Sequence, residues 1–227
     1  MQADTLATMA AAENGARSPR ARMTGSERRQ QLIEIAKSLF AERGYDGTAV
    51  EEIASRAGVS KPVVYEHFGG KEGLYAVVVD REVQQLLGMF ATALSGESPR
   101  ELLEQACLVL LTYVEEHGDG FRILVRESPV GMERSGGFAT IMSDVASQVE
   151  YILVQQFKAR GFETKLAPLY SQALVGMVAL AGQWWQDHRR PKREEVAAHL
   201  VNLAWNGLKG LEAKPVLTSL PRNGTNR

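Results

Sequence analysis

Residues Thr48 to Phe68 read TAVEEIASRAGVSKPVVYEHF and contain two short helical patterns separated by a turn. Apolar residues recur at helical spacing in both segments, which predicts two helices that each keep one face for packing. These residues are Val50, Ile53, Ala54 and Ala57, then Val59, Val64 and Phe68. Glycine enters the left-handed region without a steric penalty, so Gly58 is expected to end the first helix. The pattern predicts a helix-turn-helix, an arrangement typical of DNA-binding proteins.

Capping residues mark where the helices of this segment begin. Thr48 is followed three residues later by Glu51, which predicts a capping box at the start of the first helix. Ser60 is placed to cap the second helix, and Pro62 falls in its first turn, where no backbone donor is needed. The second helix is therefore the candidate recognition helix.

A helix before this segment is predicted to open at Ser26 and to end at Arg43 and Gly44. Residues 1–24 are predicted to be a disordered basic arm. Between Gly15 and Arg29 the chain has five arginines against one glutamate, a local charge of +4. Such a segment either follows DNA phosphates or enters a minor groove, or it is a solvated tail.

The run from Arg28 to Tyr75, RRQQLIEIAKSLFAERGYDGTAVEEIASRAGVSKPVVYEHFGGKEGLY, resembles the DNA-binding domain of TetR-type transcriptional regulators. Three elements carry the resemblance in register: Phe-x-x-x-Gly-Tyr, Ala-Gly-Val-Ser-Lys and Tyr-x-x-Phe-x-x-Lys-Glu. The resemblance covers about a fifth of the chain. It implies a dimer that binds operator DNA and carries a helical domain enclosing a small-molecule site.

Composition narrows the class of protein. The 227 residues are 44% hydrophobic and 23% charged, as in ordinary globular proteins. A net charge of -1 argues against a protein that coats nucleic acid nonspecifically. The single cysteine forms no intrachain disulfide, and the chain has neither a secretory signal pattern nor an apolar run long enough to span a membrane. These features predict a cytoplasmic protein that contacts no membrane.

The remaining chain reads as helical throughout, so the predicted fold class is all-α. Gly69 and Gly70 close the recognition helix, and a long connecting helix follows from Lys71 to Leu94. Five more helices are predicted over Pro99–His117, Gly120–Glu127, Phe138–Arg160, Lys165–His188 and Lys192–Glu212. The expected domains are a helix-turn-helix DNA-binding domain at 25–70, a helical effector-binding and dimerisation domain at 71–212, and a flexible tail at 213–227.

DNA contacts follow from placing the second helix in the major groove. Lys61 would donate to phosphate or guanine, Pro62 would offer a rigid apolar contact, and Val63 would offer an apolar surface suited to a thymine methyl. Val63 is alternatively a core valine, and relatives commonly have Thr or Ser there. The resemblance adds phosphate contacts from Tyr65, His67 and the Thr48 hydroxyl. The candidate DNA-binding set is Arg28, Thr48, Ser60, Lys61, Pro62, Val63, Tyr65, His67 and Lys71.

The last two long helices are the candidate dimer interface, because small and apolar residues line one side of each. They are Ala173, Gly176, Met177, Leu180, Ala181 and Trp184, with Val196, Leu200, Leu203, Ala204, Gly207 and Leu208. Intrachain core is the competing interpretation.

The middle helices carry the candidate ligand-binding set, which is Phe90, Cys107, Leu111, Phe121, Leu124, Val125, Met142, Val149 and Trp184. Packing into the core is the alternative explanation for each of these residues. Cys107 lies on an apolar stripe with no adjacent cation to stabilise a thiolate, which predicts an inert cysteine and no redox sensor.

These observations favour a dimeric transcriptional regulator, a repressor that binds a palindromic operator and responds to a hydrophobic small molecule such as an acyl chain or lipophilic drug. The alternative is a helical lipid- or acyl-binding protein without sequence-specific DNA binding. Val63 and Glu66 favour that alternative, since a carboxylate near DNA is repelled. The chain shows no motif of an enzyme, metal site or cofactor site.

Overall fold

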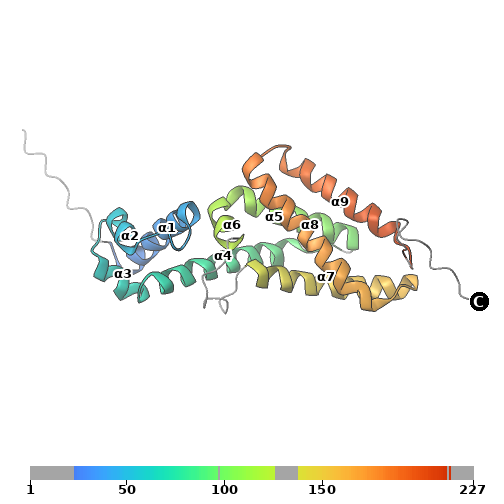
Figure 1. Cartoon of the computed structure of the whole chain (residues 1–227), viewed down its shortest axis with the longest axis horizontal. Coiled ribbons are helices and arrows are strands. Elements are labelled where there is room, and N and C mark those ends of the chain that lie inside the picture. Colours follow the sequence, from blue (N-terminus) through green and yellow to red (C-terminus); the bar gives the residue numbers. More distant parts are fainter. Residues whose placement is uncertain (1–22, 97, 126–137, 214, 216–227) are drawn as a thin grey trace, which may run out of the picture.

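The computed structural model describes residues 23–96, 98–125, 138–213 and 215, and these are helical with short connections (Figure 1). The helices are α1 (Gly25–Arg43), α2 (Val50–Ala57), α3 (Lys61–Phe68), α4 (Lys71–Ala93), α5 (Pro99–Glu116), α6 (Gly118–Val125), α7 (Phe138–Arg160), α8 (Ala167–His188) and α9 (Arg193–Lys209). A single 3₁₀ turn, η1 (Thr164–Leu166), precedes α8. The predicted all-α class is confirmed. No helix within the described ranges is both long and apolar enough to cross a membrane.

The molecule is elongated, with α1, α2 and α3 gathered at one end of α4 (Figure 1). From this end α4 runs along the long axis into the second group of helices, where α5, α7, α8 and α9 pack together. The α6 helix lies beside α1, so the first and second groups touch directly as well as through α4. The predicted connecting role of the long helix therefore matches its position.

Two helices begin with a formed capping box. The Thr24 hydroxyl accepts from the Glu27 N–H at 3.2 Å, and the Glu27 carboxylate accepts from the Thr24 N–H at 2.7 Å. Ser98 and Glu101 form the same reciprocal pair at the start of α5. The predicted opening of the first helix at Ser26 is wrong, because Thr24 is the residue whose backbone is extended and whose side chain caps the helix.

The predicted capping box at Thr48 is also wrong. The α2 helix begins one residue later than expected, its N-cap is Ala49, and no side chain caps it. By contrast, Gly58 does end α2 in the left-handed conformation, with φ of 66°. The N–H of the next residue, Val59, donates to the Ala54 carbonyl at 2.9 Å and closes the turn before α3.

A continuous apolar core joins the two groups of helices. It extends from Leu32 and Phe40 in α1, through Leu86 in α4, to Phe121 in α6 and Trp185 in α8. A second, smaller cluster of Leu153, Phe157 and Ala167 lies between α7 and α8. Each large side chain in these clusters contributes about 1.5–3 kcal/mol by leaving water. The core therefore crosses the boundary expected at residue 70.

Several helix boundaries differ from the sequence expectation by one to three residues, among them those of α6 and α9. The α6 helix begins at Gly118 instead of Gly120, and Gly120 lies buried inside it. The α9 helix ends at Lys209 instead of Glu212, and the Gly210 N–H closes its last turn on the Asn206 carbonyl at 3.1 Å. The end predicted for the sixth helix at Glu127, and nearly all of the expected arm and tail, lie outside the described residues.

Candidate functional site

The exposed side of α3 carries three residues that are expected to contact DNA, together with Glu66 beside them. Lys61, Pro62, Tyr65 and Glu66 are exposed, and they share one side of the helix at spacings of three and four residues. Val64 is fully buried and anchors the opposite side. Val63 is half-buried, so it is not a core valine in the sense of Val64 and keeps part of its surface for a partner.

Lys61 forms an ion pair with Glu51 of α2. Its Nζ lies 2.6 Å from Glu51 Oε1, and it also lies 5.7 Å from the centre of the Tyr65 ring. The hydrogen bond from Lys61 lowers the pKa of the Glu51 carboxyl, and the same bond raises the pKa of Lys61. Both groups are exposed to solvent, where such pairs contribute little. Lys61 can therefore exchange Glu51 for a DNA phosphate or a guanine.

Two adjacent arginines of α1 bond the C-terminal ends of the two helices of the helix-turn-helix. Arg28 Nη1 donates to the Ala57 carbonyl at 3.1 Å, at the C-terminus of α2. Arg29 Nη1 donates to the His67 carbonyl at 3.0 Å, and its guanidinium lies 4.4 Å from the centre of the Phe68 ring. Cations at helix C-termini satisfy free carbonyls and complement the helix dipole. Arg28, a predicted DNA contact, uses its Nη1 to position the end of α2.

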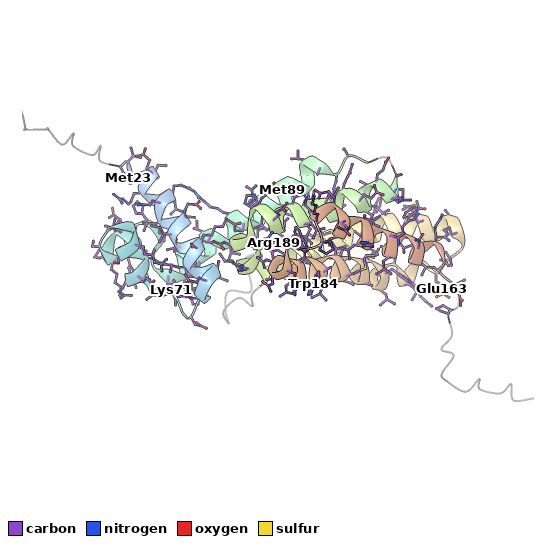
Figure 2. The ribbon with its side chains drawn as sticks, turned by 90° about the horizontal axis from the view of Figure 1, so that it is seen from above. Met23, Lys71, Met89, Glu163, Trp184 and Arg189 are labelled. Carbon is purple, nitrogen blue, oxygen red and sulfur yellow. The ribbon has the colours of Figure 1, made fainter. Side chains whose placement is uncertain are left out.

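Lys71 fastens the loop between α1 and α2 to the start of α4. Its Nζ donates to the Tyr45 carbonyl at 2.8 Å and to the Thr48 carbonyl at 3.0 Å, and lies 4.2 Å from the centre of the Tyr45 ring. An ammonium has three donors, so one remains for a phosphate. Figure 2 shows Lys71 at the end of the molecule formed by the first three helices.

The Thr48 hydroxyl, which is predicted to contact a phosphate, points into the protein in this structure. Thr48 is only 1% exposed, and its hydroxyl donates to the Gly44 carbonyl at 2.7 Å. Because α2 begins after Ala49, the Thr48 side chain turns inward and closes the loop that follows α1. Ser60 behaves differently: its side chain makes no cap hydrogen bond and is exposed, which leaves its hydroxyl available to a phosphate.

A cavity of about 430 Å³ lies among α4, α5, α7, α8 and α9. Its lining is mainly apolar and includes Leu87, Phe90, Leu103, Ala106, Val149, Ile152, Leu153, Phe157, Leu174 and Trp205. The polar residues of the lining are Asp144, Gln148, Gln156, Arg160 and Lys209. This combination suits an apolar ligand with a small number of polar contacts.

Of the nine residues expected to bind a ligand, Phe90 and Val149 lie in the cavity lining. The remaining seven lie elsewhere. Cys107, Leu111, Phe121 and Leu124 are buried in the main core, and Val125 and Met142 pack against that core. Trp184 is 52% exposed and stacks on His188 at 4.4 Å between ring centres. These seven side chains therefore meet other helices or solvent and do not line this cavity.

Sequence reasoning missed most of the cavity lining contributed by α7. Asp144, Gln148, Ile152 and Gln156 lie on one stripe of that helix, which faces the cavity. Their spacing of four residues was a readable signal for a shared face. Because the stripe mixes polar and apolar residues, the apolar pattern alone did not predict it.

Cys107 is an inert core residue. It has no exposed surface, and burial raises the pKa of its thiol to about 12. The thiol therefore stays protonated near neutral pH, while reactivity toward oxidants and alkylating agents requires the thiolate. This agrees with the expectation that Cys107 is no redox sensor.

The α8 and α9 helices expose large apolar side chains. Leu169, Leu180 and Trp184 on α8 and Leu203 on α9 are between 52% and 67% exposed. Trp184 lies at the edge of the molecule in Figure 2. Leu180 and Trp184 lie one turn apart on α8, and contiguous exposed apolar side chains are typical of a protein interface.

Not all of the expected interface residues share this exposure. The small residues Ala173 and Gly176 lie on α8 between Leu169 and Leu180. Val196 and Ala204 of α9 are instead buried within the chain, where they pack against the other helices. These two residues therefore belong to the intrachain core.

Family comparisons cover both parts of the chain. Residues 32–78 match the family described as bacterial regulatory proteins, tetR family. Residues 99–207 match the family described as tetracyclin repressor-like, C-terminal domain. The two matches leave most of α4 between them as the connection.

Curated relatives and solved structures agree with these matches. The transcriptional activator FasR from Mycolicibacterium smegmatis is 30% identical over 189 residues, which cover 82% of this chain and 85% of that protein. The transcriptional repressor KstR2 from Rhodococcus jostii is 37% identical over 89 residues, which cover 39% of this chain and 43% of that protein. A TetR-like regulator from Rhodococcus sp. RHA1 has a TM-score of 0.66 and 27% identity, and the match covers 84% of this chain and 100% of that chain.

Proposed function

Because the chain belongs to the TetR family of DNA-binding transcriptional regulators, we propose that it is a repressor whose operator affinity is controlled by an apolar ligand. The observation that carries this proposal is the course of α4. The helix begins at Lys71, beside the recognition helix, and its other end lines the cavity with Leu87 and Phe90. Its 23 residues span roughly 35 Å, so a ligand and DNA act on the same rigid element.

Operator recognition is proposed to use the exposed side of α3. Lys61, Pro62 and Val63 face the base edges, while Ser60, Tyr65 and His67 contact the backbone. Lys71 reaches a phosphate with its remaining donor. One helix-turn-helix reads few base pairs, so two copies would bind half-sites roughly 34–36 Å apart on a palindromic operator.

Dimerisation is proposed to occur through α8 and α9, which would form a four-helix bundle with the same helices of a second copy. The exposed Leu180, Trp184 and Leu203 support this arrangement. Ala173 and Gly176 permit close approach of the backbones. Burying each leucine would contribute about 1.5–3 kcal/mol.

The proposed effector is an elongated apolar molecule, such as an acyl chain or a lipophilic drug. The lining supports this class because most of its residues are apolar. Arg160 is fixed by hydrogen bonds to the Leu208 carbonyl at 3.0 Å and the Lys209 carbonyl at 3.1 Å. A polar or anionic end of the effector would lie near Arg160 and Lys209, the two cations of the lining.

Repression is proposed as the direction of control, because a dimer covering its operator blocks polymerase without requiring any contact with it. Relatives of this chain include one protein named as an activator and one named as a repressor. Transcription in vitro from a promoter that contains the operator distinguishes the two directions. Addition of the protein should lower transcript yield, and an increase would overturn repression.

The ligand response is tested by titrating operator DNA in the presence of saturated fatty acids of increasing chain length. An effector that prefers the DNA-incompetent state by about 1–3 kcal/mol lowers operator affinity roughly 5- to 150-fold. Ala106→Phe, which fills the cavity, is the matched control and should remove the response. Unchanged operator affinity at saturating concentrations of every acid would reject acyl chains as effectors, and lipophilic cations would then be tested in the same way.

A further inference from the structure

A buried carboxylate lies where the DNA-binding helices meet the rest of the molecule. Glu82 of α4 is only 7% exposed, and α4 packs against α1, α5 and α6 around it. Charged side chains are seldom buried unless they are paired. The surroundings of Glu82 therefore indicate what the charge does there.

The two oxygens of Glu82 bind different parts of the molecule. Lys37 of α1 places its Nζ 2.6 Å from Oε1, and the Tyr113 hydroxyl of α5 donates to Oε2 at 2.8 Å. Lys37 belongs to the DNA-binding helices and Tyr113 to the C-terminal domain. Tyr113 has no exposed surface, and burial raises the pKa of its hydroxyl, so it remains a donor throughout the accessible pH range.

Gly120 of α6 completes the cluster. A Cβ at this position would collide with the Glu82 carboxylate and would lie 2.6 Å from the Tyr113 hydroxyl. The absence of a side chain at Gly120 is therefore what lets α6 approach the pair. Side chains of α1, α4 and α5 and the backbone of α6 meet at this one carboxylate.

The joint between α5 and α6 is in turn bonded to α8. Gln186 Nε2 donates to the Gly118 carbonyl at 2.6 Å, and Arg189 Nη2 donates to the Val114 carbonyl at 3.1 Å. Arg189 lies near the middle of the molecule in Figure 2. It directly follows α8, the helix that carries the exposed Trp184. Direct contacts thus lead from α8, through the α5–α6 joint, to Glu82 and α1.

We propose that Glu82 is a positioning residue for operator recognition. By binding Lys37 and Tyr113 together, its carboxylate fixes the orientation of the DNA-binding helices relative to the C-terminal domain. In a dimer this orientation sets the separation of the two recognition helices. Buried polar pairs add little net stability, and in some proteins they specify one geometry, which is the property that this role requires of Glu82. The proposal rests on dimeric operator binding and is independent of any effector.

The test measures how strictly the protein depends on half-site spacing. An operator is selected from a randomised duplex library with the wild-type protein, and variants are made with one base pair added or removed between the half-sites. The wild type should bind the original spacing most tightly. Tyr113→Phe and Lys37→Met should weaken binding to that spacing by at least about fivefold and flatten the dependence on spacing. Affinity for a single half-site should not change.

Control variants separate positioning from damage to the fold. Tyr170→Phe removes a hydroxyl from a half-buried tyrosine that packs on Phe157, far along the chain from this cluster, and should keep the wild-type spacing profile. Gly120→Ala retains all three polar side chains but displaces the Glu82 carboxylate, so it should behave like Tyr113→Phe. If Tyr113→Phe fails to fold, Gly120→Ala takes its place in the test. Equal loss on single half-sites and on every spacing would indicate general damage and overturn the proposal.

A second measurement does not depend on DNA. A spin label is attached to the cysteine of a Glu66→Cys variant in both copies of the dimer. Pulsed electron paramagnetic resonance then gives the distribution of distances between the two labels. Adding Tyr113→Phe or Gly120→Ala should broaden or shift that distribution, whereas Tyr170→Phe should not. A folded, dimeric Tyr113→Phe protein with the wild-type distribution and spacing profile would contradict the role of Glu82.

Discussion

The α3 and α8 helices present opposite chemistry to solvent. The exposed side of α3 carries Lys61 and Glu66, and the charge of Lys61 is already matched by Glu51 of α2. The exposed side of α8 carries Leu180 and Trp184. An ion pair in water is easily exchanged, whereas exposed apolar area favours lasting association. This difference supports the proposals that α3 forms a reversible interface with DNA and that α8 forms a stable interface with another copy.

The largest effect is expected at the apolar interface. Leu180→Glu changes the same position twice in a symmetric dimer, so it should weaken association by about 3–6 kcal/mol. Sedimentation equilibrium should show a monomer, and specific operator binding should disappear. Tyr151→Glu, which changes an equally exposed aromatic residue on α7, is the matched control and should remain dimeric. A dimeric Leu180→Glu protein would place the interface elsewhere.

A core residue and an interface residue should respond differently to dilution. Phe121→Ala removes a fully buried ring and should lower the free energy of unfolding by about 3–5 kcal/mol at any protein concentration. Trp184→Ala should lower the free energy of unfolding only at protein concentrations at which the wild type is dimeric. The stability that dimerisation adds depends on protein concentration. Chemical denaturation at several concentrations distinguishes them. A concentration-independent loss for Trp184→Ala would show it to be intrachain core.

Lys61 and Lys71 should differ in the way they affect DNA binding. Lys61→Met should reduce operator affinity and also change the preferred bases, since its side chain is free to leave Glu51. Lys71→Met should weaken all sequences nearly alike. If each lysine binds one phosphate per protomer, the slope of log affinity against log salt should become shallower by about 0.9 for each phosphate that is no longer neutralised. Binding to a randomised library at several salt concentrations measures both effects, and unchanged affinity and preference for Lys61→Met would exclude it from the interface.

The smallest effect concerns two serines at helix starts. Ser98→Ala removes a formed capping box and should cost about 1 kcal/mol of unfolding free energy. Ser60→Ala removes a hydroxyl that makes no cap bond and should change stability by less than about 0.5 kcal/mol. Thermal unfolding measures both values. An equal loss of unfolding free energy for Ser60→Ala would mean that the Ser60 hydroxyl caps α3 in solution and is not available to bind DNA.

Local sequence signals predicted the helices well because they act over a few residues. Gly58 ended α2 as expected, and the helix predicted from Lys71 to Leu94 is observed from Lys71 to Ala93. The capping pattern was less reliable. Thr24 and Thr48 both precede a glutamate by three residues, yet only Thr24 forms the box. The Thr48 hydroxyl finds a carbonyl at the end of the preceding helix, which a local pattern does not reveal.

The ligand site could not be predicted to the same degree. An apolar stripe shows which side of a helix is apolar, but it does not show whether that side contacts the core, a cavity or another chain. Phe121 meets the core, Phe90 meets the cavity, and Trp184 meets solvent, although all three looked alike in the sequence. The same limit applies to Glu82, whose partners come from α1 and α5 and are far away in the chain.

Two copies of this chain, joined through α8 and α9, are proposed to read a symmetric operator with α3. Selecting a randomised duplex library with the full-length protein and sequencing the bound fraction tests it most directly. The expected result is an inverted repeat whose half-sites are centred roughly 34–36 Å apart, and Leu180→Glu should not enrich it. Enrichment of a single asymmetric site that Leu180→Glu binds equally well, or no enrichment at all, would contradict the claim.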